Sequence, residues 1–179
     1  KFFSLTADYI FGHDLLGVAK AFFAANGATL LGDELVATDA TDFSPFLLKI
    51  RQANPDVVCS NLAGNQVTNF IKQYAEFGLP FPIVGFNLNT ADAWAAGDGN
   101  LSGTWPTSWH HDLDTPASKA FTAAFTAKHG KPPENHAWIE YITLKAIAQA
   151  ITETKSTESD ALIAYFEKQT QFDIMKGRK

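Results

Sequence analysis

The sequence predicts an α/β domain with a Rossmann-like parallel sheet that has helices on both of its faces. Two observations lead to this class: short apolar runs recur through residues 1–107, and segments with helical apolar spacing separate them. The runs occupy residues 2–5, 29–36, 56–60 and 82–86, at the roughly 30-residue spacing of βαβ units. Strands that alternate with helices pair in parallel, and those helices cover the sheet.

The first two helices are predicted from apolar spacing and from residues that start or stop helices. One helix is expected at residues 13–26, before Gly27. The next begins at Ser44, a candidate N-cap because Pro45 would occupy the first turn. Phe43 and Leu48 have the spacing of a hydrophobic staple across this start. The apolar face of the first helix consists of Leu15, Val18, Ala19, Phe22 and Phe23.

A third helix is predicted before Gly78, which is a typical helix stop when Pro80 follows. Its apolar residues recur at i, i+3, i+4 and i+7, so they share one face. This face consists of Val67, Phe70, Ile71 and Tyr74.

Residues 108–179 are predicted to form a second region that is mainly helical. Thr115 and Pro116 open one helix, and Gly130 closes it. A longer helix, at 136–154, is apolar around most of its circumference, so it needs more cover than a surface helix does. We therefore expect the isolated chain to self-associate through this helix.

The last elements are predicted near the end of the chain. Thr157 and Asp160 have capping-box spacing, which indicates a helix at 160–169. A further strand is expected to begin at 172–175.

Composition excludes several functions. The chain has 14 Lys and Arg against 19 Asp and Glu, a formal net charge of -5, and its basic residues are not clustered. Nucleic-acid binding is therefore not predicted. The single cysteine, Cys59, lies in an apolar run, so we expect a buried, inert thiol. No run approaches the roughly 20 apolar residues that a membrane-spanning helix needs.

No motif for catalysis, a cofactor or a metal ion is evident. The chain lacks the glycine motifs that bind phosphates and the Gly-x-Ser-x-Gly turn of a nucleophilic serine. His110 and His111 are adjacent, and on an extended segment their side chains would point to opposite faces. Asp112 alone does not complete a site. We therefore predict a protein that is not an enzyme and that has neither a cofactor nor a metal site.

The loops that follow the strands are the candidate binding regions, because open parallel sheets bind ligands outside the carboxyl ends of their strands. These loops are residues 6–12, 39–42, 61–65 and 87–90. Most of their Asn, Thr and Asp residues are explained as helix caps. Phe11, Gly64 and Asn87 are less easily explained in this way. Phe11 is an aromatic residue in a loop, and Gly64 permits a close approach of the backbone to a ligand.

Five segments together resemble type I periplasmic binding proteins, and most closely the leucine/isoleucine/valine-binding proteins of ABC transporters. They are Asp-Tyr-Ile-Phe-Gly at 8–12, Asp-Phe-Ser-Pro-Phe-Leu at 42–47, Pro-Asp-Val-Val at 55–58, and the segments 72–79 and 136–151. The resemblance implies a larger protein with two Rossmann-like lobes that clamp a small molecule. Residues 1–107 would be the second lobe, and 108–179 the crossover and part of the first lobe.

The resemblance also implies a periplasmic protein that delivers an amino acid, or an aromatic or other organic acid, to a membrane permease. Phe11 stands where amino-acid-binding members often have Tyr before Gly, and it would form a wall of the pocket. Ala63, beside Gly64, stands near another pocket aromatic and would leave space. Asn87 stands where those members carry an acidic residue that faces the ligand's ammonium group. These differences favour an aromatic or other organic acid.

Two alternatives remain open. The effector-sensing core of a transcription regulator or receptor shares the two-lobe architecture, and a flavodoxin-like sheet also occurs in enzymes. A signal peptide in the complete gene would favour the transport protein, whereas a helix-turn-helix would favour the regulator.

Overall fold

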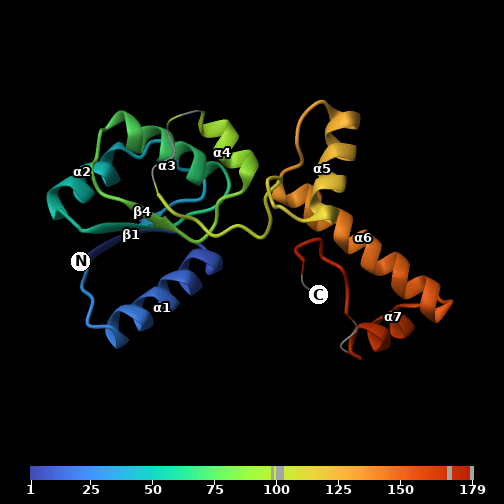
Figure 1. The fold of residues 1–179 in the computed structure, drawn as a ribbon. Helices are drawn as coiled ribbons and strands as arrows, with labels where there is room; N and C mark the ends of the chain where they lie inside the picture. The colour runs from blue at the N-terminus through green and yellow to red at the C-terminus, as the bar shows by residue number, and fades with distance from the viewer. Residues whose placement is uncertain (98, 100–102, 169–170, 178–179) are drawn as a thin grey trace. The chain divides into compact units, whose positions relative to one another are not determined.

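The computed structural model describes residues 1–97, 99, 103–168 and 171–177. It divides into two compact units, Lys1–Thr107 and Ser108–Lys179 (Figure 1).

The first unit contains the predicted parallel sheet. Its strands are β1 (Phe2–Ala7), β2 (Leu30–Val36), β3 (Val57–Asn61) and β4 (Ile83–Gly85). They lie in the order β2-β1-β3-β4, and every pair of neighbours is parallel. Thr104 continues the sheet beyond β4, because it forms a parallel bridge with Val84. The predicted fold class is therefore confirmed.

Helices cover both faces of this sheet. α1 (Ile10–Ala25) lies on one face, and α2 (Ser44–Ala53) and α3 (Asn65–Glu76) lie on the other (Figure 1). A short helix, α4 (Thr90–Ala96), follows β4. The larger core lies between the sheet and the α2 and α3 helices. Its fully buried large side chains include Leu5, Phe43, Leu47, Ile50, Val58, Val67, Phe70 and Ile71.

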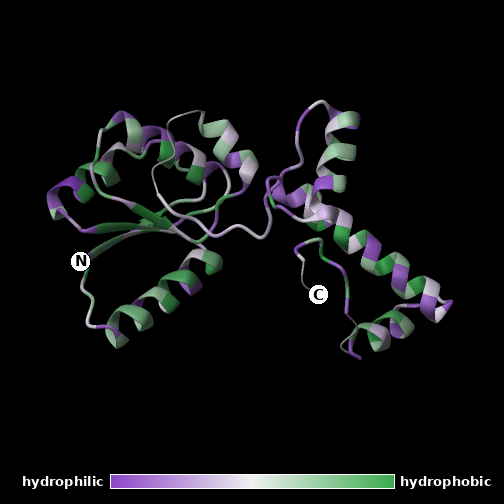
Figure 2. Cartoon of the chain, in the orientation of Figure 1, coloured by the Kyte–Doolittle hydropathy of each residue, from purple (hydrophilic) through white to green (hydrophobic). Residues whose placement is uncertain are grey.

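The smaller core of the first unit lies between α1 and the sheet. Ala19 and Phe23 are buried there together with Cys59. α1 is hydrophobic over much of its length, including its outer side (Figure 2). Val18 and Phe22, which were predicted for its covered face, are 68% and 61% exposed. The prediction that Val18 and Phe22 face the sheet is therefore wrong. The buried residues of the helix are Gly12, Leu16, Ala19 and Phe23.

The start of α2 also differs from the prediction. Phe43, not Ser44, is its N-cap residue, and the Ser44 backbone N–H donates to Asp42 Oδ1 at 2.9 Å. The predicted staple does not form: Phe43 is fully buried, whereas Leu48 is 49% exposed. Phe43 packs against the ring of Phe70, with centroids 5.8 Å apart. Burial of this aromatic ring in the core thus determines how the chain enters α2.

α3 has the face that its spacing predicts. Val67, Phe70, Ile71 and Tyr74 are all buried. Gly78, just after the helix, has a φ of +60°, which is the left-handed conformation that glycine adopts without a steric penalty. Both the buried face and the stop are confirmed.

The second unit is helical, with α5 (Pro116–His129), α6 (Asn135–Thr154) and α7 (Ser159–Phe166). Thr115 caps α5 as predicted, because its side chain accepts a hydrogen bond from the Ser118 backbone N–H at 3.2 Å. Gly130 is the C-cap of α5. The core of this unit is built around Trp109, Trp138 and Met175.

Two predictions for the end of the chain are wrong. α7 follows Glu158 and has no side-chain cap, so Thr157 and Asp160 do not form a capping box. Residues 172–175 are not a strand. The Met175 carbonyl instead accepts hydrogen bonds from Thr115 Oγ1 at 2.6 Å and Ser118 Oγ at 2.7 Å. Side chains of α5 and its cap satisfy this backbone group, so no partner strand is needed.

We expect the isolated chain to self-associate through α6. Ile139, Tyr141, Leu144 and Ile147 of this helix are 36%, 42%, 64% and 37% exposed, and an exposed apolar face of this kind favours association. Light scattering should give a mass that rises with protein concentration. Leu144→Lys should lower this mass at a given concentration, because it places a charge on the exposed apolar surface of α6. Leu48→Lys, an equally drastic change at an exposed leucine of α2, is the control. A strict monomer at high concentration would contradict this expectation.

Candidate functional site

The carboxyl ends of β1, β3 and β4 lie together at one edge of the sheet. Thr6 in β1 is paired with Asn61 in β3, and Ser60 is paired with Gly85 in β4. The chain leaves these three neighbouring strands through the segments that carry Phe11, Ala63 with Gly64, and Asn87. The topology therefore brings the segments with all four predicted site residues to the same edge.

Phe11 lies in the first turn of α1, not in a loop as predicted. It is half-buried, and its ring stacks on that of Tyr9, with centroids 5.8 Å apart. A side chain at Gly12 would collide with the backbone of Ala7, so glycine allows α1 to start directly against the end of β1. The two rings thus form one aromatic surface at the carboxyl edge. The sequence analysis missed Tyr9, although it belongs to the same Asp-Tyr-Ile-Phe-Gly motif.

Ala63 and Gly64 form the connection from β3 to α3. Ala63 is half-buried, and Gly64 is exposed at the N-cap of α3 with a φ of +55°. Apart from Gly64 itself and its two neighbours in the chain, no described atom lies within 4 Å of the point that a Cβ of Gly64 would occupy. The space beside this backbone is therefore open, and the positive φ favours glycine. A close approach of this backbone to a ligand stays a prediction.

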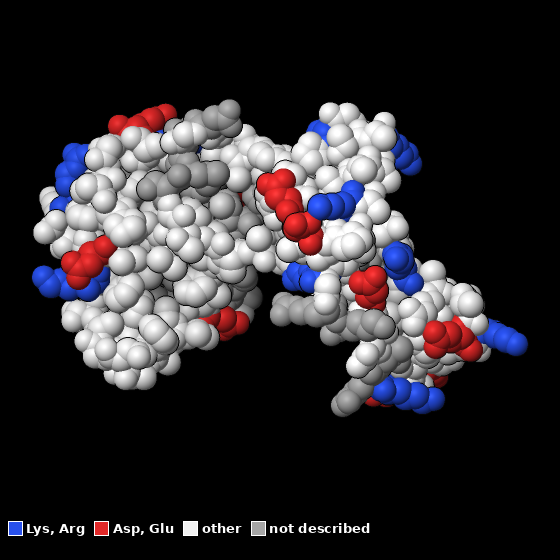
Figure 3. Space-filling view, in the orientation of Figure 1, with Lys and Arg blue, Asp and Glu red and all other residues white. Residues whose placement is uncertain are grey.

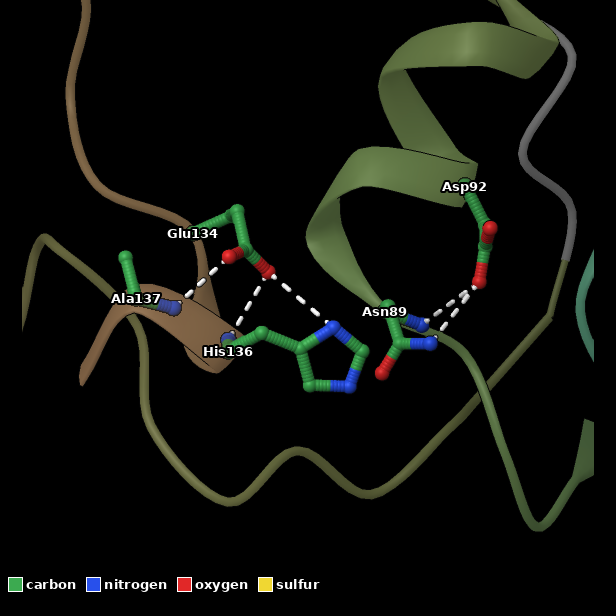
Figure 4. Close-up of polar contacts among 5 residues, drawn as sticks. All are labelled: Asn89, Asp92, Glu134, His136 and Ala137. Carbon is green, nitrogen blue, oxygen red and sulfur yellow. Dashed lines mark hydrogen bonds and ion pairs between the residues drawn. The ribbon is translucent and has the colours of Figure 1, made fainter. Parts of the chain in front are cut away.

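Asn87 is half-buried between β4 and α4. On one side of it, the Phe86 backbone N–H donates to the Ser60 carbonyl at 3.3 Å. On the other, Asn89 donates to Asp92 Oδ2 from its backbone N–H at 3.3 Å and from Nδ2 at 3.1 Å, at the start of α4 (Figure 4). Asn87 is thus held between two fixed points. The Asp92 carboxylate, which follows in the sequence, is occupied by the helix cap.

A polar network lies beneath the carboxyl edge, on the face of the sheet that α1 covers. Asn61 Nδ2 donates to Ser4 Oγ at 2.9 Å and to Thr6 Oγ1 at 3.1 Å, and Thr6 Oγ1 donates to Asp33 Oδ1 at 2.7 Å. Asn61 was predicted in a loop, but it is the last residue of β3 and fully buried. These bonds join β1, β2 and β3 to one another, so they stiffen the support of the site.

A separate hollow of about 260 Å³ lies where the β2–α2 connection meets the start of α3. The Gln66 side chain supports it by donating to the carbonyls of Val36 at 3.2 Å and Ala37 at 2.8 Å. Small-molecule sites usually measure about 300–1,000 Å³, so this hollow is small for a ligand. It is lined by Thr38, Asp39, Ala40, Thr41, Asn65, Gln66, Thr68 and Asn69. Four of these residues lie in the predicted binding loops 39–42 and 61–65, but none is among the four residues predicted to contact the ligand.

Three properties of the described residues bear on what composition predicts. Burial raises the pKa of the Cys59 thiol to about 11, so this group stays protonated and weakly reactive at neutral pH. On the visible face of each unit, acidic and basic side chains are interspersed and form no extended basic patch (Figure 3). Among the described helices, none combines the length and the apolar character that crossing a membrane requires.

Comparison with known proteins decides the family. A family model described as periplasmic binding protein matches residues 1–179. The chain belongs to this family. A curated relative, the Leu/Ile/Val-binding protein homolog 8 of Brucella abortus (strain 2308), is 26% identical in an alignment 168 residues long that covers 88% of this chain and 41% of the relative. The predicted leucine/isoleucine/valine-binding type of periplasmic binding protein is thereby confirmed.

Solved structures support the same family. A periplasmic binding protein from Burkholderia mallei is 27% identical with a TM-score of 0.83, over 97% of this chain and 47% of that protein. A solute-binding protein of an ABC transporter from Rhodopseudomonas palustris BisB5, solved with 3,4-dihydroxybenzoic acid, is 27% identical with a TM-score of 0.76, over 91% of this chain and 47% of that protein. The chain thus spans less than half the length of these relatives.

Proposed function

We propose that this periplasmic binding protein chain is part of the substrate-binding component of an ABC transporter of the branched-chain amino acid type. In this proposal the carboxyl edge of the sheet forms one wall of the ligand site. The observation that carries it is the convergence of Phe11, Ala63 with Gly64, and Asn87 on three adjacent strand ends. Ligands of open α/β sheets bind at such edges, and the described residues there include no catalytic constellation.

The proposed setting follows from the family. Residues 1–107 serve as the second lobe of a two-lobe protein, and residues 108–179 supply the crossover and part of the first lobe. The ligand binds between the lobes, outside the cytoplasm, and passes to a membrane permease. The relatives are about twice as long as this chain, which is consistent with such a partial site.

The proposed ligand is an organic acid with an aromatic or bulky apolar body. A carboxylate that faces a ligand ammonium forms a charge-assisted hydrogen bond, roughly twice as strong as a neutral one. Asn87 has a neutral amide in its place. The stacked rings of Tyr9 and Phe11 supply an apolar wall, and the small side chain of Ala63 leaves room beside it.

The comparisons support both this ligand class and its alternative. The Rhodopseudomonas palustris relative was solved with an aromatic acid, whereas the Brucella abortus relative is named for leucine, isoleucine and valine. An amino acid is therefore the alternative ligand, and the charge at position 87 is the feature that separates the two.

Calorimetry on the complete protein tests this proposal with leucine, valine, benzoate and a phenylalkanoate. We expect the aromatic acids to bind at least about tenfold more tightly than the amino acids, a difference of about 1.4 kcal/mol. Asn87→Asp should reduce or reverse this preference for aromatic acids over amino acids. The new carboxylate attracts the ammonium group of an amino acid and is costly to desolvate beside an aromatic ring. Gln52→Glu adds the same charge on α2 and should leave the preference unchanged. Tight leucine binding without any response to the aromatic acids would refute the role of Asn87.

A further inference from the structure

Two histidines and an aspartate form a cluster at the start of the second unit. His110, His111 and Asp112 can each offer one ligand atom, and these atoms lie within 4.8 Å of one another. His110 Nδ1 is 3.5 Å from Asp112 Oδ2, and His111 Nε2 is 3.6 Å from Asp112 Oδ1. The two imidazole rings lie with centroids 4.1 Å apart and planes inclined by 32°.

The sequence predicted that the two histidine rings would point apart, and this expectation is wrong. The segment is not extended, because residues 111 and 112 form a turn that the Leu113 N–H closes by donating to the His110 carbonyl at 3.1 Å. A turn rotates successive side chains toward the same side, whereas an extended strand alternates them. The tight turn is therefore what brings three potential ligands together.

The core of the second unit anchors this turn. Trp109, directly before it, is 2% exposed, and Leu113, directly after it, packs against the same core. Thr122 Oγ1 in α5 donates to the His111 carbonyl at 3.3 Å. The backbone is held at both ends, so an ion would need to adjust only the side chains.

We propose that His110, His111 and Asp112 form a binding site for a divalent transition-metal ion such as Zn²⁺ or Cu²⁺. Zinc ligands at about 2.0–2.2 Å in a tetrahedral arrangement lie roughly 3.3–3.6 Å from one another. Each histidine already lies at about this distance from one oxygen of the Asp112 carboxylate. Small side-chain rotations would bring the three single ligand atoms, which lie within 4.8 Å of one another, to the same spacing. Imidazole nitrogens combined with one carboxylate suit Zn²⁺ and Cu²⁺ better than Mg²⁺ or Ca²⁺. Three protein ligands leave a coordination position open to water or to a further ligand.

The hydrogen bond that His110 Nδ1 accepts bears on how an ion would bind. The Asp112 backbone N–H donates to His110 Nδ1 at 3.3 Å, a length beyond the usual range for N–H···O bonds and therefore a weak interaction. The ion either displaces this bond or coordinates Nε2 of the same ring. The side chains of His110 and Asp112 are 42% and 80% exposed, so solvent already reaches both.

Copper titration of the 179-residue chain tests the proposal. Binding is followed by the quenching of tryptophan fluorescence, because Trp109 adjoins the cluster, and by electron paramagnetic resonance of the bound ion. We expect one tight Cu²⁺ per chain with hyperfine coupling to two imidazole nitrogens. His110→Ala and Asp112→Asn should each weaken binding by at least about tenfold, and His110→Ala should leave coupling to a single nitrogen.

His13→Ala is the matched control. His13 is also an exposed histidine beside an aspartate, with its Nε2 3.0 Å from Asp8 Oδ1. Among the residues that the structure describes, no third His, Cys, Asp or Glu joins this pair. This variant should bind Cu²⁺ like the unchanged chain, and circular dichroism should show that all variants are folded. Absence of tight Cu²⁺ binding to the unchanged chain would overturn the proposal. So would a Cu²⁺ affinity of His110→Ala and Asp112→Asn that equals the affinity of the unchanged chain.

Discussion

Phe70→Ala is expected to lower the free energy of unfolding of the first unit by about 3–5 kcal/mol. Phe70 is fully buried in the larger core, where its ring lies 5.8 Å from that of Phe43 and 5.3 Å from that of Tyr74. Truncation removes these contacts and leaves a cavity between α3 and the sheet. This loss is a large share of the roughly 5–15 kcal/mol that stabilises a typical domain.

Phe22→Ala removes the same atoms from an exposed site, so it is the matched control. Phe22 is 61% exposed on α1, and its truncation should change stability by less than about 1 kcal/mol. Urea unfolding followed by circular dichroism measures both variants. Equal midpoints for the two would contradict the assignment of the main core to the α2 and α3 side of the sheet.

The contrast between these phenylalanines shows what apolar spacing predicts well. In α3 the spacing specified a narrow stripe, and all four of its residues are buried. In α1 the apolar residues form a broad stripe, which does not reveal which half faces the sheet. Leu16 is buried but was not predicted, whereas Val18 is exposed. Close contact at Gly12 fixes the rotation of α1, and a contact with a strand is not visible in the spacing of one helix.

The candidate site was predicted as loops, and its geometry depends on where helices begin. The strand ends were placed within a few residues, so the segments that carry Phe11, Ala63, Gly64 and Asn87 could be named. α1 nevertheless begins at Ile10 without a side-chain cap, and the prediction began the helix three residues later. Without a capping side chain, no local pattern marks this start of the helix. Tyr9 was missed for the same reason, because its role depends on the ring of Phe11 beside it.

Interactions between distant residues were the least predictable. The polar network that joins Ser4 to Asn61 and Thr6 to Asp33 connects three strands. No local sequence pattern predicts it. The carbonyl of Met175 is bound by Thr115 and Ser118, which lie about 60 positions earlier. The strand at 172–175 was predicted from local residue types. Local residue types carry no information on hydrogen-bond partners that lie far away in the sequence.

Trp109→Ala is expected to unfold or strongly loosen the second unit while leaving the first unit intact. The Trp109 ring stacks on Trp138 with centroids 6.1 Å apart and packs edge-on against Phe121. Its Nε1 donates to Ser118 Oγ at 2.9 Å, and Ser118 Oγ donates to the Met175 carbonyl at 2.7 Å. Truncation thus removes the largest buried side chain of this small core and one hydrogen bond of a buried serine. The expected cost is about 3–5 kcal/mol.

Hydrogen exchange with mass spectrometry separates the two units, because it reports protection segment by segment. In Trp109→Ala, amides of α5 and α6 should exchange much faster, whereas those of β1, β3 and α3 should keep their protection. Trp109→Phe retains a ring that can stack on Trp138 but loses the donor to Ser118. The free energy of unfolding of its second unit should therefore lie between that of Trp109→Ala and that of the unchanged chain, about 1–2 kcal/mol below the latter. Faster exchange spread equally over both units would show that Trp109 does not support one unit alone. Unchanged exchange in α5 and α6 would show that the stacked tryptophans do not hold the second unit together.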